Sequence, residues 1–241
     1  MIQGKTVLGI VPARGGSKRI PRKNLVELAG KPLIAYTIEA GLRSRFIDTV
    51  VVSTDDREIA DVSRSLGAQV PFLRPAELAL DESSTFDAVQ HAVDYYKQIG
   101  KEFGYIVLLQ ATSPLRDSGD IDNAVELLLH KQADAVISVC EVEHNPLWAN
   151  KLPEDLSMNG FLTEAVKNKR SQDLAKYYRL NGAIYICAIE RLLQEKSFSI
   201  KENIFAYIMP LEKSVDIDTM LDLKLCEILL KEDSKALHAQ D

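Results

Sequence analysis

The sequence predicts an α/β fold: a doubly wound, mostly parallel sheet in a three-layer αβα sandwich, with one protruding arm. Short apolar runs that are typical of buried strands alternate with stretches in which apolar residues recur at helical spacing. Strands separated by helices pair in parallel through right-handed crossovers, and these crossovers place helices on both faces of a sheet. The alternation stops between residues 144 and 178, where prolines, polar residues and the only tryptophan appear instead.

The composition is that of a single domain. The chain has 241 residues, of which 46% are hydrophobic, and this is enough for one sizeable core. We expect one domain over residues 1–231, with residues 144–178 inserted as the arm and residues 232–241 forming a polar tail. The formal net charge of −6, from 29 basic and 35 acidic residues, argues against a nucleic-acid partner.

The sequence carries no sign of a membrane or secreted protein. No apolar run approaches the length of a membrane span, and the first residues lack the apolar core of a signal peptide. Cys140, Cys187 and Cys226 are widely spaced and form no C-x-x-C motif, which suits a reducing compartment. We therefore expect a cytoplasmic protein with no membrane contact.

In the first half of the chain, β-branched and apolar runs predict strands over residues 7–11, 49–54, 69–73 and 105–109. Three helices are expected between them. The first opens at Lys31-Pro32 and runs to about residue 42, because proline suits the first turn of a helix. The second follows the capping pair Asp55-Asp56 and runs to about residue 66. The third starts at Ser83 or Ser84 and places Phe86, Val89, Val93 and Tyr96 on one face.

In the second half, helical spacing predicts a helix over residues 121–128, and apolar runs predict strands over 135–139, 181–188 and 205–209. A closing helix is expected over residues 220–230, with Leu221, Leu225 and Ile228 on one face. A structureless loop as long as 144–178 is unusual inside a compact domain. We therefore expect this segment to form an arm or flap that contacts a second subunit.

The stretch I-V-P-A-R-G-G-S-K-R-I-P-R-K-N, residues 10–24, carries a cluster of cations and no acidic residue. Gly15, Gly16 and Ser17 lie where the first strand must turn, so we expect positive φ angles and backbone N–H groups that point to one place. Cations and free amides at the carboxyl end of a strand predict a phosphate site. The alternative is a solvated basic loop. Neither a G-x-G-x-x-G fingerprint nor a Walker-type G-x-x-x-x-G-K-[ST] loop is present.

The stretch A-R-G-G-S-K-R-I-P-R-K-N resembles the A-R-x-x-S-K-x-x-x-x-K-N loop of the acylneuraminate cytidylyltransferases, which make CMP-activated sialic, legionaminic and related nine-carbon sugars. The resemblance extends over residues 7–230. L-L-Q-A-T-S-P-L-R (residues 108–116) is similar to the family's L-L-Q-P-T-S-P-L-R, and S-V-D-I-D-T (214–219) to its S-I-D-I-D-T. R-P-A-E-L-A-L-D-E-S-S (74–84) and K-R-S-Q-D-L-A-K-Y-Y-R-L-N-G-A-I-Y (169–185) also resemble family segments. Ala111 and Ala175 replace prolines that are usual in the family.

The resemblance implies a role for each matching residue. It implies that CTP phosphates meet the side chains of Arg14, Lys18 and Lys23 and the turn at Gly15 and Ser17, with Asn24 facing the cytosine and Ser84 the ribose. It implies that the acceptor sugar meets Gln110, Thr112, Ser113, Arg179 and Tyr185, with Arg179 pairing with the sugar carboxylate. A surface salt bridge at Arg179 and a structural role for Tyr185 are the alternatives. Arg170 stands one position from a family arginine and is expected to reach the sugar from the arm, as part of a flap and homodimer contact.

The reaction that the resemblance implies is CTP plus a nine-carbon 2-keto sugar acid giving the CMP-sugar and pyrophosphate. Arg14, Lys23, Asp216 and Asp218 are the expected catalytic residues. Asp216 and Asp218 are two apart in a segment that reads as extended, so their side chains share one face and suit Mg²⁺, with Mn²⁺ as a substitute. The alternative is that Asp218 or Thr219 caps the closing helix.

Other functions remain open at this point. The enzyme class includes cytidylyltransferases for other 2-keto sugar acids, such as pseudaminate or Kdo. A sugar-1-phosphate nucleotidyltransferase would share the fold, with a longer glycine-rich first loop. A nucleotide-binding protein without activity would keep the basic loop but would have no use for Gln110, Arg179 and the two aspartates together.

Overall fold

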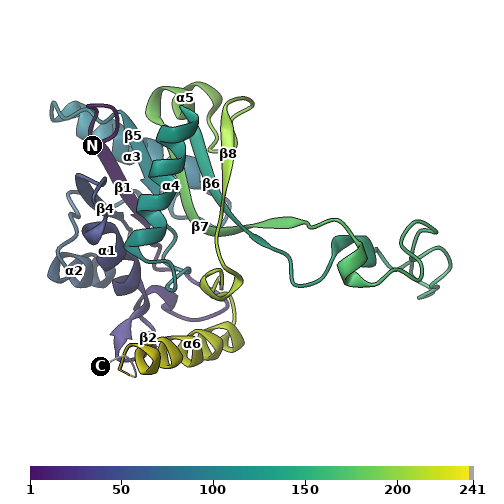
Figure 1. Cartoon of the computed structure of the whole chain (residues 1–241). Coiled ribbons are helices and arrows are strands. Elements are labelled where there is room, and N and C mark those ends of the chain that lie inside the picture. The colour runs from purple at the N-terminus through teal and green to yellow at the C-terminus, as the bar shows by residue number, and fades with distance from the viewer. Residues whose placement is uncertain (239–241) are drawn as a thin grey trace.

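The computed structural model describes residues 1–238 and consists of one mixed sheet with helices on both faces (Figure 1). The six-stranded sheet has the order β4-β1-β5-β7-β6-β8. Its strands are β1 (Val7–Pro12), β4 (Thr49–Ser53), β5 (Tyr105–Leu108), β6 (Ala135–Glu141), β7 (Tyr178–Ala188) and β8 (Ile204–Ile208). The helices are α1 (Leu33–Arg43), α2 (Arg57–Ser65), α3 (Thr85–Gln98), α4 (Ser118–Lys131), α5 (Ile189–Glu195) and α6 (Met220–His238).

Two apolar cores confirm the predicted three-layer sandwich. Side chains along β1 alternate between them: Val7 and Val11 enter one core, and Leu8 and Ile10 enter the other. Helices α1, α2 and α4 cover the first core, while α3 and α5 cover the second. Because both faces of the strand are covered, all four of these side chains are fully buried.

The mostly parallel sheet is also confirmed, with one strand reversed. β1 pairs in parallel with β4 and β5, and β6 pairs in parallel with β8. β7 runs antiparallel to both of its neighbours, β5 and β6. The chain returns from the arm rather than from a crossover helix, so β7 can lie beside β6 in the opposite direction.

Several boundaries differ from the predicted ones. Residues 69–73 form no strand: Gln69 makes a single parallel bridge to Val51, and Pro71 has no N–H with which to continue the ladder. β7 begins at Tyr178 instead of residue 181, and the short helix α5 was not predicted. α6 continues to His238, past the expected end at residue 230 and into the segment expected to be a tail.

A third apolar cluster fixes the elements that surround the carboxyl end of β1. It consists of Ile20, Leu28, Leu33, Leu115, Ile217, Leu223 and Cys226. The cluster packs α6 and the small hairpin of β2 (Glu27–Leu28) and β3 (Lys31–Pro32) beside the basic loop. Leu223 and Cys226 therefore form the buried side of α6. Leu221, Leu225 and Ile228 share the exposed side, where their relative exposures are 75%, 44% and 55%.

Residues 144–176 extend away from the body of the protein as the predicted arm (Figure 1). The arm contains the 3₁₀ turns η3 (Pro146–Trp148) and η4 (Ser171–Asp173). The side chains of Leu152, Leu156 and Met158 are exposed along it.

All three cysteines are buried and free, as expected for a chain without paired thiols. Within residues 1–238 there is no helix whose length and apolar character would let it cross a membrane.

Candidate active site

The basic loop leaves β1 at its carboxyl end and is held by carboxylates from several other parts of the chain. Arg14 forms an ion pair with Asp81 at 2.8 Å, and Lys18 pairs with the same carboxylate. Asp81 lies in the turn before α3, so the loop cations are drawn toward that turn. The bond from Lys18 is the main reason why the pKa of Asp81 lies below its ordinary value, and Arg14 adds to the effect.

The two glycines do not act as predicted. Neither Gly15 nor Gly16 has a positive φ; in this loop the left-handed residue is Arg22, at φ 53°. The Gly15 amide donates to Asp55 Oδ1 at 3.1 Å, and the Ser17 amide donates to the Gly15 carbonyl at 3.1 Å. These amides therefore have protein acceptors and do not converge on a free point. Gly15 is needed because a β-carbon there would lie 2.9 Å from Asp56 Oδ2, beside the N-terminus of α2.

Lys23 and Asn24 connect the loop to the segment that carries the two aspartates. Lys23 Nζ donates to the Ile217 carbonyl at 2.7 Å and to Asp218 Oδ1 at 3.2 Å. Asn24 is buried, and its amide donates to the Arg14 carbonyl at 2.9 Å. Asn24 thus braces the backbone of the loop.

A first pocket, of about 490 Å³, lies where these elements meet, as the sequence predicted for the carboxyl ends of the strands. Four of its eight lining residues are cationic and one is acidic. It is lined by Arg14, Ser17, Lys18, Arg19, Lys23, Asn24, Thr112 and Asp218. Thr112 comes from the loop after β5, residues 110–116, which we call the Gln110 loop, so the basic loop and the Gln110 loop face one cavity. The charge of the walls suits a phosphate chain.

Asp216 lies at the edge of this site and has an unusual environment. Its side chain is largely buried, and its Oδ1 has no hydrogen-bond partner. Burial raises the pKa of the Asp216 carboxyl; a hydrogen bond from the Thr112 side chain opposes this shift, and the charge of Asp218 reinforces it. The Ile217 amide donates to the Thr112 carbonyl at 2.8 Å, which ties the segment to the Gln110 loop.

Asp218 does not cap α6. Its Oδ2 accepts from Arg19 at 2.7 Å, and its Oδ1 accepts from Lys23. Thr219 and Asp222 bond to each other at the start of the helix: Asp222 Oδ2 accepts from the Thr219 amide at 2.7 Å. The capping explanation therefore applies to Thr219, whereas Asp218 pairs with cations of the basic loop.

A second pocket, also of about 490 Å³, is lined in part by Asp216. Asp216 lines this pocket and Asp218 lines the first, so the two carboxylates border adjacent cavities. Arg179 projects into the second pocket from β7 and forms an ion pair with Glu143 at 3.0 Å. The other walls are the apolar side chains of Leu211, Val215, Leu225 and Leu229 and the carboxylates of Glu212 and Asp222.

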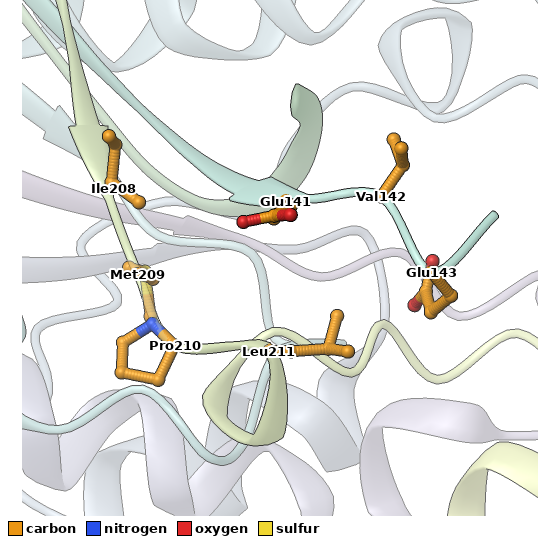
Figure 2. A pocket seen from close by; sticks show the side chains of 7 residues that line it. All are labelled: Glu141, Val142, Glu143, Ile208, Met209, Pro210 and Leu211. Atoms are coloured by element: carbon orange, nitrogen blue, oxygen red, sulfur yellow. The ribbon is translucent and has the colours of Figure 1, made fainter. Parts of the chain in front are cut away.

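A third pocket, of about 580 Å³, adjoins the second and contains none of the predicted site residues (Figure 2). It lies between the ends of β6 and β8, and its charged residues are Glu141 and Glu143. Its lining residues include two carboxylates and, unlike those of the second pocket, no cation that could pair with a phosphate or a sugar carboxylate, so we assign no substrate to it.

Gln110 and Asp216 meet at a glycine of β7. Gly182 has φ +76°, and a β-carbon there would lie 2.9 Å from Gln110 Oε1 and 3.7 Å from Asp216 Oδ2. The sheet is irregular beside it, because the register of β6 and β7 shifts between Ile137 and Val139. Bulges of this kind re-aim side chains next to active sites.

Four other predicted residues line neither the first nor the second pocket. Tyr185 is partly buried, with its ring 5.8 Å from that of Phe198. Ser113 is fully buried, and its hydroxyl has no partner. Ser84 caps α3 by accepting from the Asp87 amide at 3.1 Å. Arg170 is exposed on the arm and lines neither the first nor the second pocket.

Sequence reasoning assigned no role to Asp81, Arg74 or Arg116. Arg74 is buried near Arg14, and burial lowers its pKa despite the Asp55 carboxylate 3.7 Å away. Burial lowers the pKa of Arg116 to about 10; its guanidinium donates to Thr37 Oγ1 at 2.8 Å, beneath the Gln110 loop. Asp81 and Arg74 lie in the stretch of residues 74–84, and Arg116 lies in that of residues 108–116; both stretches resemble family segments. Their ionisable side chains within these stretches were the signal that could have identified them.

Comparison with known proteins gives a consistent result. A family model described as cytidylyltransferase matches residues 8–236. The CMP-N,N'-diacetyllegionaminic acid synthase of Legionella pneumophila is 38% identical over 238 residues, covering 96% of this chain and 99% of that protein. A pseudaminic acid cytidylyltransferase of Campylobacter jejuni is 38% identical, covering 93% and 96%. An N-acylneuraminate cytidylyltransferase of Escherichia coli is 36% identical over 91% of this chain, which spans 51% of that protein.

The solved structures agree on the fold. A CMP:2-keto-3-deoxy-manno-octonic acid synthetase, solved in complex with CTP, superimposes with a TM-score of 0.68 at 18% identity, covering 95% of this chain and 99% of that one. A 4-diphosphocytidyl-2C-methyl-D-erythritol synthase from Anaerococcus prevotii superimposes with a TM-score of 0.64 at 13% identity.

Proposed function

This chain belongs to the cytidylyltransferase family, and we propose that it transfers the cytidylyl group of CTP to a nine-carbon 2-keto sugar acid, releasing pyrophosphate. The observation that carries the proposal is the cationic first pocket, with Arg14, Lys18 and Lys23 on its walls, beside a second pocket that contains Arg179. A triphosphate suits the first and a carboxylate-bearing sugar suits the second.

The reaction needs alignment and charge neutralisation more than covalent chemistry. The anomeric hydroxyl of the sugar attacks the α-phosphorus, and the bond from that phosphorus to the bridging oxygen of pyrophosphate breaks. Arg14, Lys18 and Lys23 stabilise the charge that develops on the leaving group. For Arg14 and Lys18, the phosphates replace the carboxylate of Asp81 as partner.

The acidic segment fits a divalent cation held jointly with the substrate. Asp216 Oδ1 is buried without a partner, and an oxygen of this kind is a suitable ligand for Mg²⁺ or Mn²⁺. No group of three or more acidic, histidine or cysteine side chains is arranged to hold a metal within the described part of the chain. The protein would therefore supply two ligands, Asp216 and Asp218, and Asp218 would first give up its ion pairs with Lys23 and Arg19. Phosphate oxygens and water would complete the coordination shell. When bound, the ion would neutralise charge at the α-phosphate.

The arm is proposed to build a homodimer. Leu152, Leu156 and Met158 are 53%, 70% and 60% exposed on the arm, and Leu221 and Ile228 form an exposed apolar side of α6. Apolar side chains in such numbers on two surfaces favour burial against a second copy. In that assembly Arg170 of the arm would approach the partner's second pocket. We also propose a cytosolic location, which the proposed use of CTP and the three free thiols support.

The relatives do not separate the possible sugars, because the legionaminic and pseudaminic enzymes are each 38% identical. We expect a sialic or legionaminic acid to be the acceptor. The test is to incubate the protein with each of the four nucleoside triphosphates, Mg²⁺ and a panel of acids, and to follow pyrophosphate. The panel holds N-acetylneuraminate, legionaminate, pseudaminate, Kdo and a sugar 1-phosphate.

Pyrophosphate release that requires CTP together with sialate or legionaminate is the expected result. Release only with pseudaminate or Kdo would keep the enzyme class and change the substrate. Release with a sugar 1-phosphate, or no release with any pair, would contradict the proposal.

A further inference from the structure

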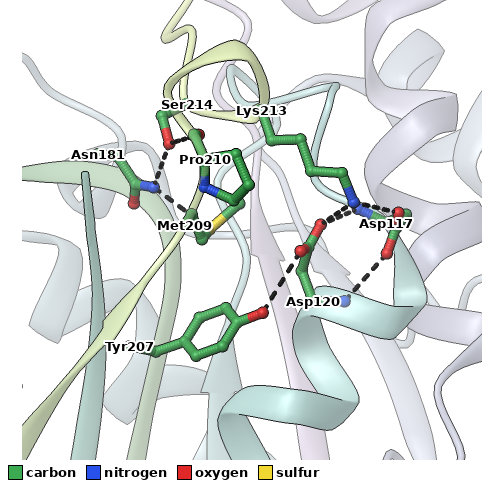
Figure 3. Close-up of polar contacts among 8 residues, drawn as sticks. All are labelled: Asp117, Asp120, Asn181, Tyr207, Met209, Pro210, Lys213 and Ser214. Atoms are coloured by element: carbon green, nitrogen blue, oxygen red, sulfur yellow. Dashed lines mark hydrogen bonds and ion pairs between the residues drawn. The ribbon is translucent and has the colours of Figure 1, made fainter. Parts of the chain in front are cut away.

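The two aspartates lie in a segment that has no helix or strand of its own. Residues 214–219 connect the 3₁₀ turn η5 (Leu211–Lys213) to α6. Regular backbone pairing therefore does not fix Asp216. The Ile217 amide, which donates to the Thr112 carbonyl at 2.8 Å, holds the segment after Asp216, and the contacts at the start of the segment hold it before Asp216. Two consecutive residues, Lys213 and Ser214, make those contacts in opposite directions (Figure 3).

Ser214 attaches the segment to β7. Its side chain is fully buried, and its hydroxyl donates to the Pro210 carbonyl at 2.7 Å while accepting from Asn181 Nδ2 at 2.9 Å. Asn181 is in turn fixed by Ser138, whose hydroxyl donates to Asn181 Oδ1 at 2.6 Å. Asn181 directly precedes Gly182, where Gln110 and Asp216 meet.

Lys213 attaches the segment to the N-terminus of α4. Its Nζ lies 2.6 Å from Asp117 Oδ2 and 3.0 Å from Asp120 Oδ2. These two carboxylates form the capping box of α4, because Asp117 accepts from the Asp120 amide and Asp120 from the Asp117 amide. Helix α4 begins directly after the Gln110 loop, so the acidic segment and that loop share one anchor.

We propose that Lys213 and Ser214 are positioning residues for the transfer reaction, which hold Asp216 against Gly182 beside Gln110. The inference rests on the proposed function, because the value of this position lies in the chemistry assigned to Asp216. Neither side chain lines the first or the second pocket, so neither touches the substrates. Loss of either contact should loosen the segment without removing any side chain that lines either pocket.

The test compares Ser214→Ala, Lys213→Met and Lys213→Arg with two matched controls. Ser63→Ala removes another buried hydroxyl that donates to a carbonyl four residues earlier, at 2.6 Å from Ile59. Lys31→Met removes another lysine that pairs with a carboxylate, Glu39, at 2.9 Å. Hydrogen exchange of residues 215–219 measures the anchoring directly, and steady-state kinetics with a CTP-binding assay measure its consequence.

Ser214→Ala and Lys213→Met are expected to speed amide exchange at residues 215–219 and to lower kcat about tenfold, with the Kd for CTP unchanged. Lys213→Arg restores both, and the controls match the wild type. Wild-type exchange and kcat in both variants would overturn the inference. The inference would also be overturned if the variants only lowered global stability, so that amide exchange rose equally over the whole chain and not mainly at residues 215–219. A wild-type protein that releases no pyrophosphate defeats the proposed function instead, while the exchange data still decide whether Lys213 and Ser214 anchor the segment.

Discussion

Asp81, in the turn before α3, forms a 2.8 Å ion pair with Arg14 at the carboxyl end of β1. A carboxylate in this place presents negative oxygens to the same cations that a phosphate would use, so the two compete. Asp81→Asn should therefore tighten CTP binding several-fold, most clearly at low ionic strength, where charge interactions are least screened. Isothermal titration with CTP measures this. Asp61→Asn is the control, because it removes a comparable ion pair with Arg64 on α2. Weaker binding in Asp81→Asn would mean that Asp81 orients the cations and does not compete with the phosphates.

Arg14 and Arg22 provide a matched pair within the basic loop. Both are arginines paired with a carboxylate, but Arg14 lines the first pocket and Arg22, which pairs with Glu58, does not. Arg14→Ala should weaken CTP binding by roughly 10- to 100-fold, since a charge-assisted hydrogen bond of about 1.5–3 kcal/mol is lost. Arg22→Ala should leave the affinity unchanged. Equal effects would indicate a general effect of loop charge.

Alanine substitutions at Gly182 and Gly100 can distinguish the effect of backbone strain from the effect of a close side-chain contact. Both have φ +76°, but only Gly182 has a neighbour where a β-carbon would be, 2.9 Å away at Gln110 Oε1. Alanine at either position should cost about 1–2 kcal/mol of stability. Gly182→Ala alone should also displace Gln110 and reduce turnover with the sugar acid. Thermal unfolding and steady-state rates measure the two effects, and full activity in Gly182→Ala would show that the contact has no part in the reaction.

The aspartates and the helix cap can be told apart by substitution. Asp216→Asn and Asp218→Asn should fold, bind CTP and release little pyrophosphate at any Mg²⁺ concentration. Thr219→Ala, which removes a cap, should lower stability by about 1 kcal/mol and leave turnover unchanged. Near wild-type rates in both aspartate variants would remove them from the chemistry.

The arm can be tested for its part in assembly. Leu156→Asp combined with Met158→Asp places two charges on exposed apolar positions of the arm, and should convert a dimer to a monomer in light scattering. Ile99→Asp, at an exposed apolar position after α3, is the control and should leave the mass unchanged. A wild-type monomer would contradict the proposed dimer.

Much of the fold was predictable because hydrophobic period and turn chemistry are local properties of the sequence. β1, β4 and the capped helices α2 and α3 follow directly from them. The reversed direction of β7 was not predictable, since it depends on how the arm returns the chain. Which side of α6 is buried was not predicted, because the helix is apolar on both sides and the cluster around Ile20 decides which side is covered.

The sequence was enough to predict which loops form the site, but not which residues contact one another within it. Both loops do line one pocket, because the carboxyl ends of parallel strands meet at one edge of the sheet. The roles of Gly15 and Gly182 are set by neighbours that lie far away in the sequence, such as Asp56 and Gln110, and no local pattern contains them. Asp81 escaped notice for the same reason.

The arm starts and ends on neighbouring strands. Glu141 of β6 and Tyr178 of β7 are register partners, and the Val142 amide still donates to the Tyr177 carbonyl at 3.0 Å. The sheet thus closes beneath the arm, which makes the arm a modular insertion in the topological sense. For a flexible loop, doubling the length costs only about 0.6 kcal/mol in closure entropy. Evolution can therefore lengthen, shorten or replace this segment, and so change what the arm contacts, without altering the strand order of the sheet.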